Sequence, residues 1–221
     1  MHDMNTDTLR IDVWSDVVCP WCYVGKRNLE TALEELGLDI EIHWRAFELD
    51  PTAPPSTSKS MAELLSAKYG VTLEQARAMN ENMTAMAASV GLTYDLENVK
   101  PGNSFDAHRL AKLAEEKGLG EEAAEALFLA YFTNNALLSD MDTLLALGVS
   151  LGLSAEDVRA VLSSEKYTDL VRSDEALAAE AGFSGVPTIV INEEFAIPGA
   201  QPPDVLVRLI GRIANGENPT S

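Results

Sequence analysis

The segment SDVVCPWCYVG, residues 15–25, contains both cysteines of this 221-residue chain, Cys19 and Cys22. Residues 9–14, just before it, alternate in the period of a β-strand. The residue after Cys19 is Pro20, which suits the first turn of a helix because its missing N–H would have no partner there. We therefore predict that the two thiols lie where a strand turns into a helix.

The segment that follows predicts a βαβ unit. The helix that begins at Pro20 is expected to end at Gly37, because glycine readily adopts the left-handed conformation just past a helix. Residues 38–49 alternate apolar and polar side chains again, which indicates a second strand. Residues 9–49 are therefore expected to fold as strand, helix and strand, with the cysteines at the first turn.

The middle of the chain carries helix signals and no convincing strand. Residues 50–60, DPTAPPSTSKS, have the composition of a linker. Beyond them, Thr72 and Gln75 have the spacing of a capping box, in which each side chain satisfies a free backbone N–H. A further helix is expected in NSFDAHRLAKLAEEKG, with Asn103 and Ser104 as candidate N-caps.

Strands return only near the C-terminus. TIVIN (188–192) and FAIPG (195–199) predict a hairpin, and Pro202 and Pro203 open a last helix. Strands at the two ends of the chain cannot bury their faces alone, so we expect one α/β sheet into which the helical block is inserted. The expected parts are an N-terminal part of the sheet domain (1–52), a helical insertion (53–182) and a C-terminal part of the sheet domain (183–221).

The composition is that of an ordinary globular protein, with 46% hydrophobic residues, but its charge is strongly negative. Sixteen Lys and Arg side chains against 35 Asp and Glu give a net charge of −19, which repels phosphate backbones and anionic lipids. We therefore expect neither nucleic acid nor a membrane as a partner. The N-terminal residues MHDMNTDTLR lack the apolar run of a signal peptide, so we expect a cytoplasmic location, where structural disulfides are rare.

Zinc binding is the first alternative role for the two thiols. A structural zinc site takes four Cys or His ligands, and the chain offers only His2, His43 and His108 beside the cysteines. No second ligand pair with metal spacing is present, so we expect no metal. For His108 two hypotheses stay open: a hydrogen-bonded residue where a helix meets the sheet domain, or a residue that lines a cleft facing Cys19.

Two further groups of side chains are candidates for contact with a substrate. Residues between the cysteines of a C-x-x-C turn usually lie beside the substrate, so Pro20 and Trp21 are candidate binding residues and Trp21 is expected to be exposed. Met79, Met83 and Met86 share one helix face by their spacing. These methionines are expected either to pack in the core or to form an adaptable substrate groove.

The order of motifs resembles a known family. A βαβ unit with C-P-W-C at its first turn, followed late in the chain by SGVPTIVIN, resembles the thioredoxin fold, and the long helical insertion resembles its DsbA branch. DVVCPWCYVGKRNLE, NSFDAHRLAKLAEEKG and GVPTIVINEEFAIPGAQPPDVL together are similar to the FrnE-like cytoplasmic members of that branch. The resemblance implies thiol–disulfide exchange, with Pro187 as the family's cis-proline and the Val186 backbone against the C-x-x-C turn.

This chemistry assigns different roles to the two thiols. Cys19, just before a helix, lies among free N–H groups and the positive end of the helix dipole, which favour the nucleophilic thiolate. We expect Cys19 to be the exposed attacking thiol and Cys22 to be the less accessible resolving thiol. The expected substrates are protein or small-molecule disulfides and thiols, with no cofactor beyond the redox-active dithiol and glutathione as a candidate co-substrate. A monomer or a homodimer is expected.

A glutathione-dependent isomerase or transferase is the second hypothesis. The 2-hydroxychromene-2-carboxylate isomerases and kappa-class glutathione transferases share this architecture but typically carry serine where Cys19 stands. They also have an Asp near the last strand, where this chain has Gly199, Ala200 and Gln201. Both departures favour the oxidoreductase. A binding or chaperone role for the helical part is a third hypothesis and stays open.

Overall fold

The computed structural model of the chain describes residues 9–38 and 40–219, so the N-terminal segment with His2 lies outside the described residues. The strands are, in chain order, β1 (Ile11–Ser15), β2 (Ile42–Ala46), β3 (Thr188–Ile191) and β4 (Phe195–Pro198). The helices are α1 (Pro20–Leu36), α2 (Met61–Tyr69), α3 (Leu73–Ser89), α4 (Phe105–Glu116), α5 (Gly120–Phe132), α6 (Met141–Ser150), α7 (Ala155–Leu162), α8 (Thr168–Glu180) and α9 (Pro203–Ala214).

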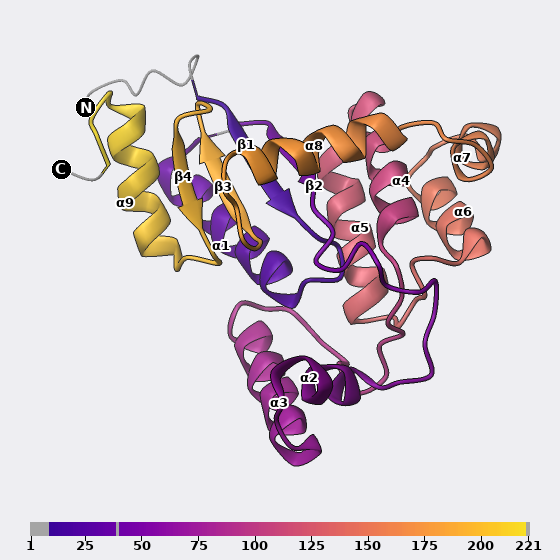
Figure 1. The fold of residues 1–221 in the computed structure, drawn as a ribbon. Coiled ribbons are helices and arrows are strands. Elements are labelled where there is room, and N and C mark those ends of the chain that lie inside the picture. Colours follow the sequence, from indigo (N-terminus) through magenta and orange to yellow (C-terminus); the bar gives the residue numbers. More distant parts are fainter. Residues whose placement is uncertain (1–8, 39, 220–221) are drawn as a thin grey trace.

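The four strands of the described chain form one mixed sheet in the order β2–β1–β3–β4 (Figure 1). β1 runs parallel to β2, with Val13 opposite Trp44. It runs antiparallel to β3, with Val13 opposite Ile189. β4 pairs antiparallel with β3 as the predicted hairpin. Strands from the two ends of the chain therefore share one sheet, as the sequence predicts.

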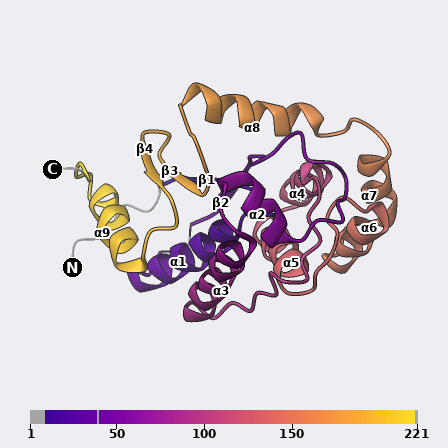
Figure 2. The ribbon, with the colours of Figure 1, turned by 60° about the horizontal axis from the view of Figure 1, so that its bottom comes forward.

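Helices cover both faces of this sheet, and the alternation of side chains along β1 decides which residue meets which helix. Ile11 and Val13 belong to the main hydrophobic core, together with residues of α1 and α9. Trp14 points to the opposite face, where it packs with Ala178 of α8. Figure 2 shows α1 and α9 side by side on one face of the sheet and α8 on the other.

Along the sequence, the helices α2–α8 come after β2 and before β3, within the range 53–182 predicted for the insertion. α4 and α5 pack against each other, and α5 and α8 also contact β2. Leu110 of α4 and Phe128 of α5 are buried in the same core as Ile11 and Val13 of the sheet. The helical segment and the sheet therefore share one continuous hydrophobic core.

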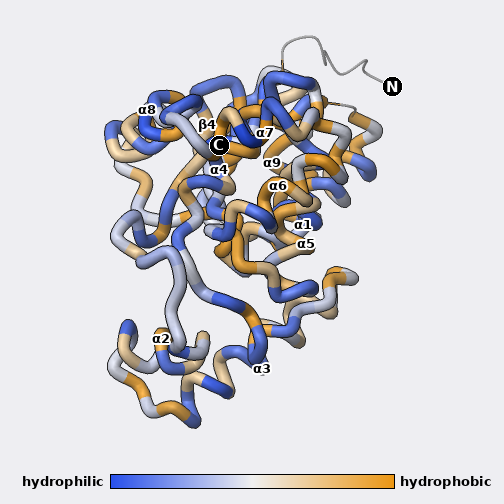
Figure 3. Tube along the Cα trace, turned by 90° about the vertical axis from the view of Figure 1, so that its right-hand side faces the viewer, coloured by the Kyte–Doolittle hydropathy of each residue, from blue (hydrophilic) through white to orange (hydrophobic). Residues whose placement is uncertain are grey.

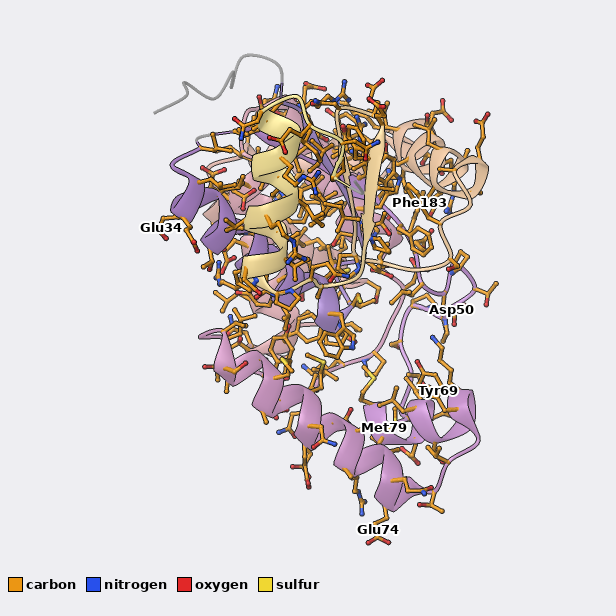
Figure 4. All side chains as sticks on the ribbon, turned by 90° about the vertical axis from the view of Figure 1, so that its left-hand side faces the viewer. Glu34, Asp50, Tyr69, Glu74, Met79 and Phe183 are labelled. Carbon is orange, nitrogen blue, oxygen red and sulfur yellow. The ribbon has the colours of Figure 1, made fainter. Side chains whose placement is uncertain are left out.

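The α2–α3 hairpin projects from the rest of the molecule (Figure 3). Figure 4 shows Tyr69, Glu74 and Met79 on this hairpin, well away from Phe183 beside the sheet. Met83 of α3 is buried, whereas Met79 and Met86 are exposed. Core packing therefore holds for Met83 but is wrong for Met79 and Met86, because the hairpin has little of the molecule packed over it and α3 buries only part of its length. The substrate groove stays a hypothesis.

Helix ends follow the sequence signals closely, with one exception. α1 ends at Gly37, whose φ of 66° is left-handed, and α3 begins with the complete Thr72–Gln75 capping box. At the start of α4 the predicted cap Ser104 makes no side-chain capping bond. Asn103 Oδ1 instead accepts a hydrogen bond of 2.8 Å from the Phe105 N–H, so Asn103 satisfies the free donor.

Candidate active site

The two cysteines flank the first turn of α1. Cys19 is the N-cap residue and Pro20 the first helical residue, and the Cys22 N–H donates to the Cys19 carbonyl at 3.0 Å. Both cysteines are free thiols. The first turn of α1 carries no acidic side chain. The Cys19 sulfur therefore lies at the positive end of a 17-residue helix with no opposing carboxylate in its first turn.

Both cysteine residues are buried, which corrects one expectation. Cys19 is 4% exposed and Cys22 1% exposed, so the prediction of an exposed Cys19 is wrong for the residue as a whole. Cys19 is covered from the side of β3, where the Val186 carbonyl oxygen lies 3.7 Å from its sulfur and accepts from the thiol. Trp21, between the two cysteines in the sequence, is 46% exposed, as expected for a residue beside a substrate.

The loop before β3 lies directly against this turn. The Val186–Pro187 peptide bond is cis. A Cβ added at Gly25 of α1 would lie 2.9 Å from Pro187 Cγ, so only glycine lets the helix approach the proline ring this closely. The Pro187 carbonyl accepts from the Gly199 N–H at 2.8 Å, which ties the loop to the end of β4. The structure thus brings Val186 and Pro187 beside the thiols.

The surroundings of Cys22 favour its protonated form. Burial raises the pKa of the Cys22 thiol well above its ordinary value, and the neighbouring Cys19 raises that pKa further. The Ser15 hydroxyl and the Asp16 backbone act in the opposite direction and lower the pKa of Cys22, but they do not prevail. A thiol that stays protonated at neutral pH is a weak nucleophile, which fits the resolving role better than the attacking role.

Tyr94 is a site residue that the sequence does not reveal. Its hydroxyl donates a hydrogen bond of 2.7 Å to the Pro20 carbonyl, and its ring stacks on Phe132 at 4.6 Å between centroids. Burial raises the pKa of Tyr94, so the hydroxyl stays a donor. Tyr94 lies between α3 and α4 in a segment without a motif, and no local pattern connects it with the thiols.

Asp16 is a second such residue, three positions before Cys19. Its carboxylate accepts from the Val18 N–H at 3.2 Å and from the Leu49 N–H at 2.7 Å, which joins the loop before α1 to the chain beyond β2. His108 of α4 places Nε2 at 3.4 Å from Asp16 Oδ1, and both side chains are buried. This position matches the first of the two hypotheses for His108, which placed it where a helix meets the sheet domain.

Comparisons with known proteins now identify the family. The family described as DSBA-like thioredoxin domain matches residues 10–211. The chain belongs to this family. The DSBA-like chain is 32% identical over 205 residues to the uncharacterized protein YwbO of Bacillus subtilis (strain 168), covering 92% of this chain and 96% of YwbO.

Solved structures agree with this assignment. The crystal structure of the probable DsbA oxidoreductase SCO1869 from Streptomyces coelicolor superposes with a TM-score of 0.87 at 40% identity, covering 95% of this chain and 91% of that one. A 2-hydroxychromene-2-carboxylate isomerase superposes with a TM-score of 0.67 at 16% identity, over 93% of this chain and 96% of that one, and so shares the fold. The predicted fold class, a thioredoxin-like α/β fold with a large helical insertion, is confirmed.

Two other properties of the described residues bear on the site. No group of three or more His, Cys, Asp or Glu side chains among them is arranged to hold a metal ion. Within the same residues, no helix has the length and the apolar character needed to cross a membrane. The candidate site is the Cys19–Cys22 turn with the Val186–Pro187 loop that covers it.

Proposed function

We propose that this DSBA-like protein is a thiol–disulfide oxidoreductase that works through its C-P-W-C dithiol and a mixed disulfide. One observation carries the proposal: Cys19 lies at the start of α1 against the Val186 carbonyl, and Cys22 lies in the same helical turn. Family membership supports the same activity. We place the activity in the cytoplasm, with glutathione as a co-substrate, in line with the sequence expectation.

The reaction takes two exchange steps. The Cys19 thiolate attacks one sulfur of a substrate disulfide, forms a mixed disulfide and releases the other sulfur as a thiolate, which takes a proton from solvent. Cys22, once deprotonated, attacks the Cys19 sulfur, forms the Cys19–Cys22 disulfide and releases the second substrate thiolate. Two electrons thus pass from the dithiol to the substrate, and the reverse sequence donates a disulfide.

The surroundings of Cys19 supply the substrate contacts in this proposal. The Val186 backbone beside the thiol offers an edge on which an extended peptide can pair as a strand does. Trp21, next to the thiol on the exposed side, offers an apolar contact. The binding residues proposed are therefore Pro20, Trp21, Val186 and Pro187.

Insulin reduction with two variants tests the proposal. Cys19→Ser should abolish turnover, because the attacking sulfur is gone. Cys22→Ser should accumulate a mixed disulfide with the substrate, detectable by mass, because the resolving sulfur is gone. Cys19→Ser that reduces insulin at the wild-type rate would contradict the mechanism.

Redox titration in glutathione buffers gives the direction of electron flow. A reversible couple near about −120 to −200 mV places the protein with oxidising or isomerising relatives, and one near about −270 mV places it with reductants such as thioredoxin. If no Cys19–Cys22 disulfide forms in any buffer, the oxidoreductase proposal fails.

A glutathione-dependent isomerase or transferase is the second candidate, because the isomerase structure shares this fold. In the segment that follows β4, the Gln201 amide donates to the Pro198 carbonyl at 2.7 Å, so this side chain already has a hydrogen-bond partner within the loop. Glutathione binding that persists in the Cys19→Ala, Cys22→Ala double variant would favour this candidate. Binding that is lost with the thiols favours the oxidoreductase.

A further inference from the structure

A small cavity lies between the end of β1, β2, α4 and α5. Its volume is about 30 Å³, and Ser15 and His108 are among the residues that line it. Both residues are at least nine-tenths buried. Among the described residues, neither Ser15 Oγ nor His108 Nε2 has an aligned hydrogen-bond partner. Buried polar atoms in native proteins almost always have a partner, often a buried water molecule, so two such atoms at one cavity indicate a water site.

The cavity is connected to the resolving thiol through Ser15. Ser15 is the last residue of β1, and its side chain points to the same face as Ile11 and Val13, the face covered by α1. Cys22 of α1 is buried in the same core as Ile11 and Val13, and the Ser15 hydroxyl is near enough to lower the pKa of its thiol. His108, which also lines the cavity, places Nε2 at 3.4 Å from the Asp16 carboxylate. The lining therefore contains one side chain near the buried thiol and one from a buried histidine–carboxylate pair.

We infer that Ser15 and His108 bind one water molecule in this cavity, and that the path from Ser15 through this water to His108 carries the proton of the Cys22 thiol in the resolving step. The inference rests on the proposed function. Cys22 is almost completely shielded from solvent, yet only its thiolate attacks the mixed disulfide. An internal proton acceptor meets this need.

The proton balance of the step is complete. The Cys22 proton passes to Ser15 Oγ, the Ser15 hydroxyl proton passes to the water, and a water proton passes to His108 Nε2. The resulting imidazolium is paired with the Asp16 carboxylate. Cys22 then forms its bond to Cys19, and the released substrate thiolate takes a proton from solvent. When substrate thiols reduce the disulfide, the same path returns a proton to Cys22.

Other charged groups face the relay and enter its pH dependence. Arg45, Lys112 and Glu115 line the cavity, and the Glu115 side chain is partly exposed. Tyr131 of α5 faces Asp16, whose charge adds to the effect of burial in raising the pKa of that tyrosine. The variants that test the relay leave these groups in place.

Stopped-flow kinetics of single turnover separate the two exchange steps. In a Cys22→Ser background, Ser15→Ala and His108→Gln should leave attack by Cys19 at its normal rate. With Cys22 present, both variants should slow resolution by about 100-fold, the usual contribution of a positioned acid–base group. Ser104→Ala removes another buried hydroxyl, at the start of α4 and outside the cavity lining, and should leave both steps unchanged.

A second measurement uses the wild-type protein, so it does not depend on variants that fold. Resolution should be slower in D₂O than in H₂O, while attack by the Cys19 thiolate should not be. Resolution at the wild-type rate in both folded variants, or the lack of any isotope effect on it, would overturn the relay and leave the oxidoreductase in place. A wild-type mixed disulfide that Cys22 never resolves would instead overturn the proposed function itself.

Discussion

At the scale of single residues, Tyr94 connects the helical segment to the chemistry. Its hydrogen bond to the Pro20 carbonyl spans 74 residues of sequence and ends between the two cysteines. The ring lies in an aromatic stack with Tyr23 and Phe132, which fixes the direction of the hydroxyl. A residue outside the sheet domain thus holds the backbone that separates the two sulfurs.

Tyr94→Phe keeps the stacked ring and removes only this hydrogen bond. We expect the free energy of unfolding to fall by about 1 kcal/mol, the usual contribution of one hydrogen bond, and alkylation of Cys22 to become faster because the turn loosens. Tyr23→Phe is the matched control, since its hydroxyl bonds to Glu125 instead. Urea unfolding and mass-resolved alkylation measure both effects. Equal Cys22 alkylation in the two variants would contradict the role of Tyr94.

At the scale of elements, the close contact between α1 and the Pro187 loop depends on a glycine in the middle of a helix. Gly25 costs helix stability relative to alanine, roughly 1 kcal/mol. This cost is offset by the close packing of Pro187 on α1, because any larger side chain at position 25 would push the proline ring away. The position of α1 against the loop is therefore set by the smallest side chain in the helix.

Two glycine-to-alanine changes test this packing. Gly25→Ala gains about 1 kcal/mol of helix propensity but overpacks against a rigid ring at a cost of about 1–3 kcal/mol, so we expect a net loss of stability and slower thiol exchange. Gly211→Ala in α9 is the control, because its Cβ would meet Leu36 at 3.4 Å, a milder contact with the flexible end of a side chain. That variant should be as stable as the wild type or more so. Thermal unfolding compares them, and a stabilised, fully active Gly25→Ala would contradict the argument.

At the scale of the whole molecule, a buried ionic network joins the sheet to the helical segment. Asp174 of α8 binds Arg45 of β2 at 3.1 Å and Lys112 of α4 at 2.8 Å, and it also accepts from the Ala46 N–H. Arg45 in turn binds Asp12 of β1 at 2.6 Å. Removing one member of such a network leaves buried charges without a partner.

Asp174→Ala is therefore expected to lower the free energy of unfolding by about 3 kcal/mol or more. Glu175→Ala, one residue on, breaks the pair with the exposed Arg172 side chain and removes a like charge that raises the pKa of Glu48, so it should cost less than about 1 kcal/mol. Urea unfolding gives both values. Similar losses in the two variants would show that the network does not hold α8 to the sheet.

Acid stability depends on the same network through Asp12. Burial raises the pKa of Asp12, but hydrogen bonds from Arg10 and Arg45 lower it by more, so the folded pKa lies below the ordinary value. An unfolded aspartate titrates near about 3.9, so this contribution to stability is present above about pH 4 and is lost as the pH falls through the folded pKa. Asp12→Asn should be less stable at neutral pH and should lose less stability on acidification. The midpoints of urea unfolding of both proteins, measured between pH 7 and about 3, check this. Midpoints that fall equally with pH in the variant and the wild type would contradict it.

Local signals predicted well the parts of the fold that depend on neighbouring residues. Pro20 and Gly37 delimit α1, and Thr72 and Gln75 begin α3, because caps act within one turn. The resemblance to the family, rather than any local signal, placed Val186 against the turn, 167 residues from Cys19, and the resulting burial of Cys19 was missed. The roles of Ser15 and Tyr94 and the contact of His108 with Asp16 were missed, because these contacts join elements whose relative positions cannot be read from the periodicity of the sequence.

The shared sheet also has a consequence for how the protein is made. β1 and the two cysteines leave the ribosome early, whereas the loop and strand that cover Cys19 follow only after the whole helical segment. Translation proceeds at about 5–20 residues per second, so the thiols spend several seconds or more in a nascent chain without their cover. The two thiols of every newly made copy can therefore be alkylated or oxidised before the protein can catalyse anything. This exposure ends when the C-terminal hairpin has been made and has joined the sheet.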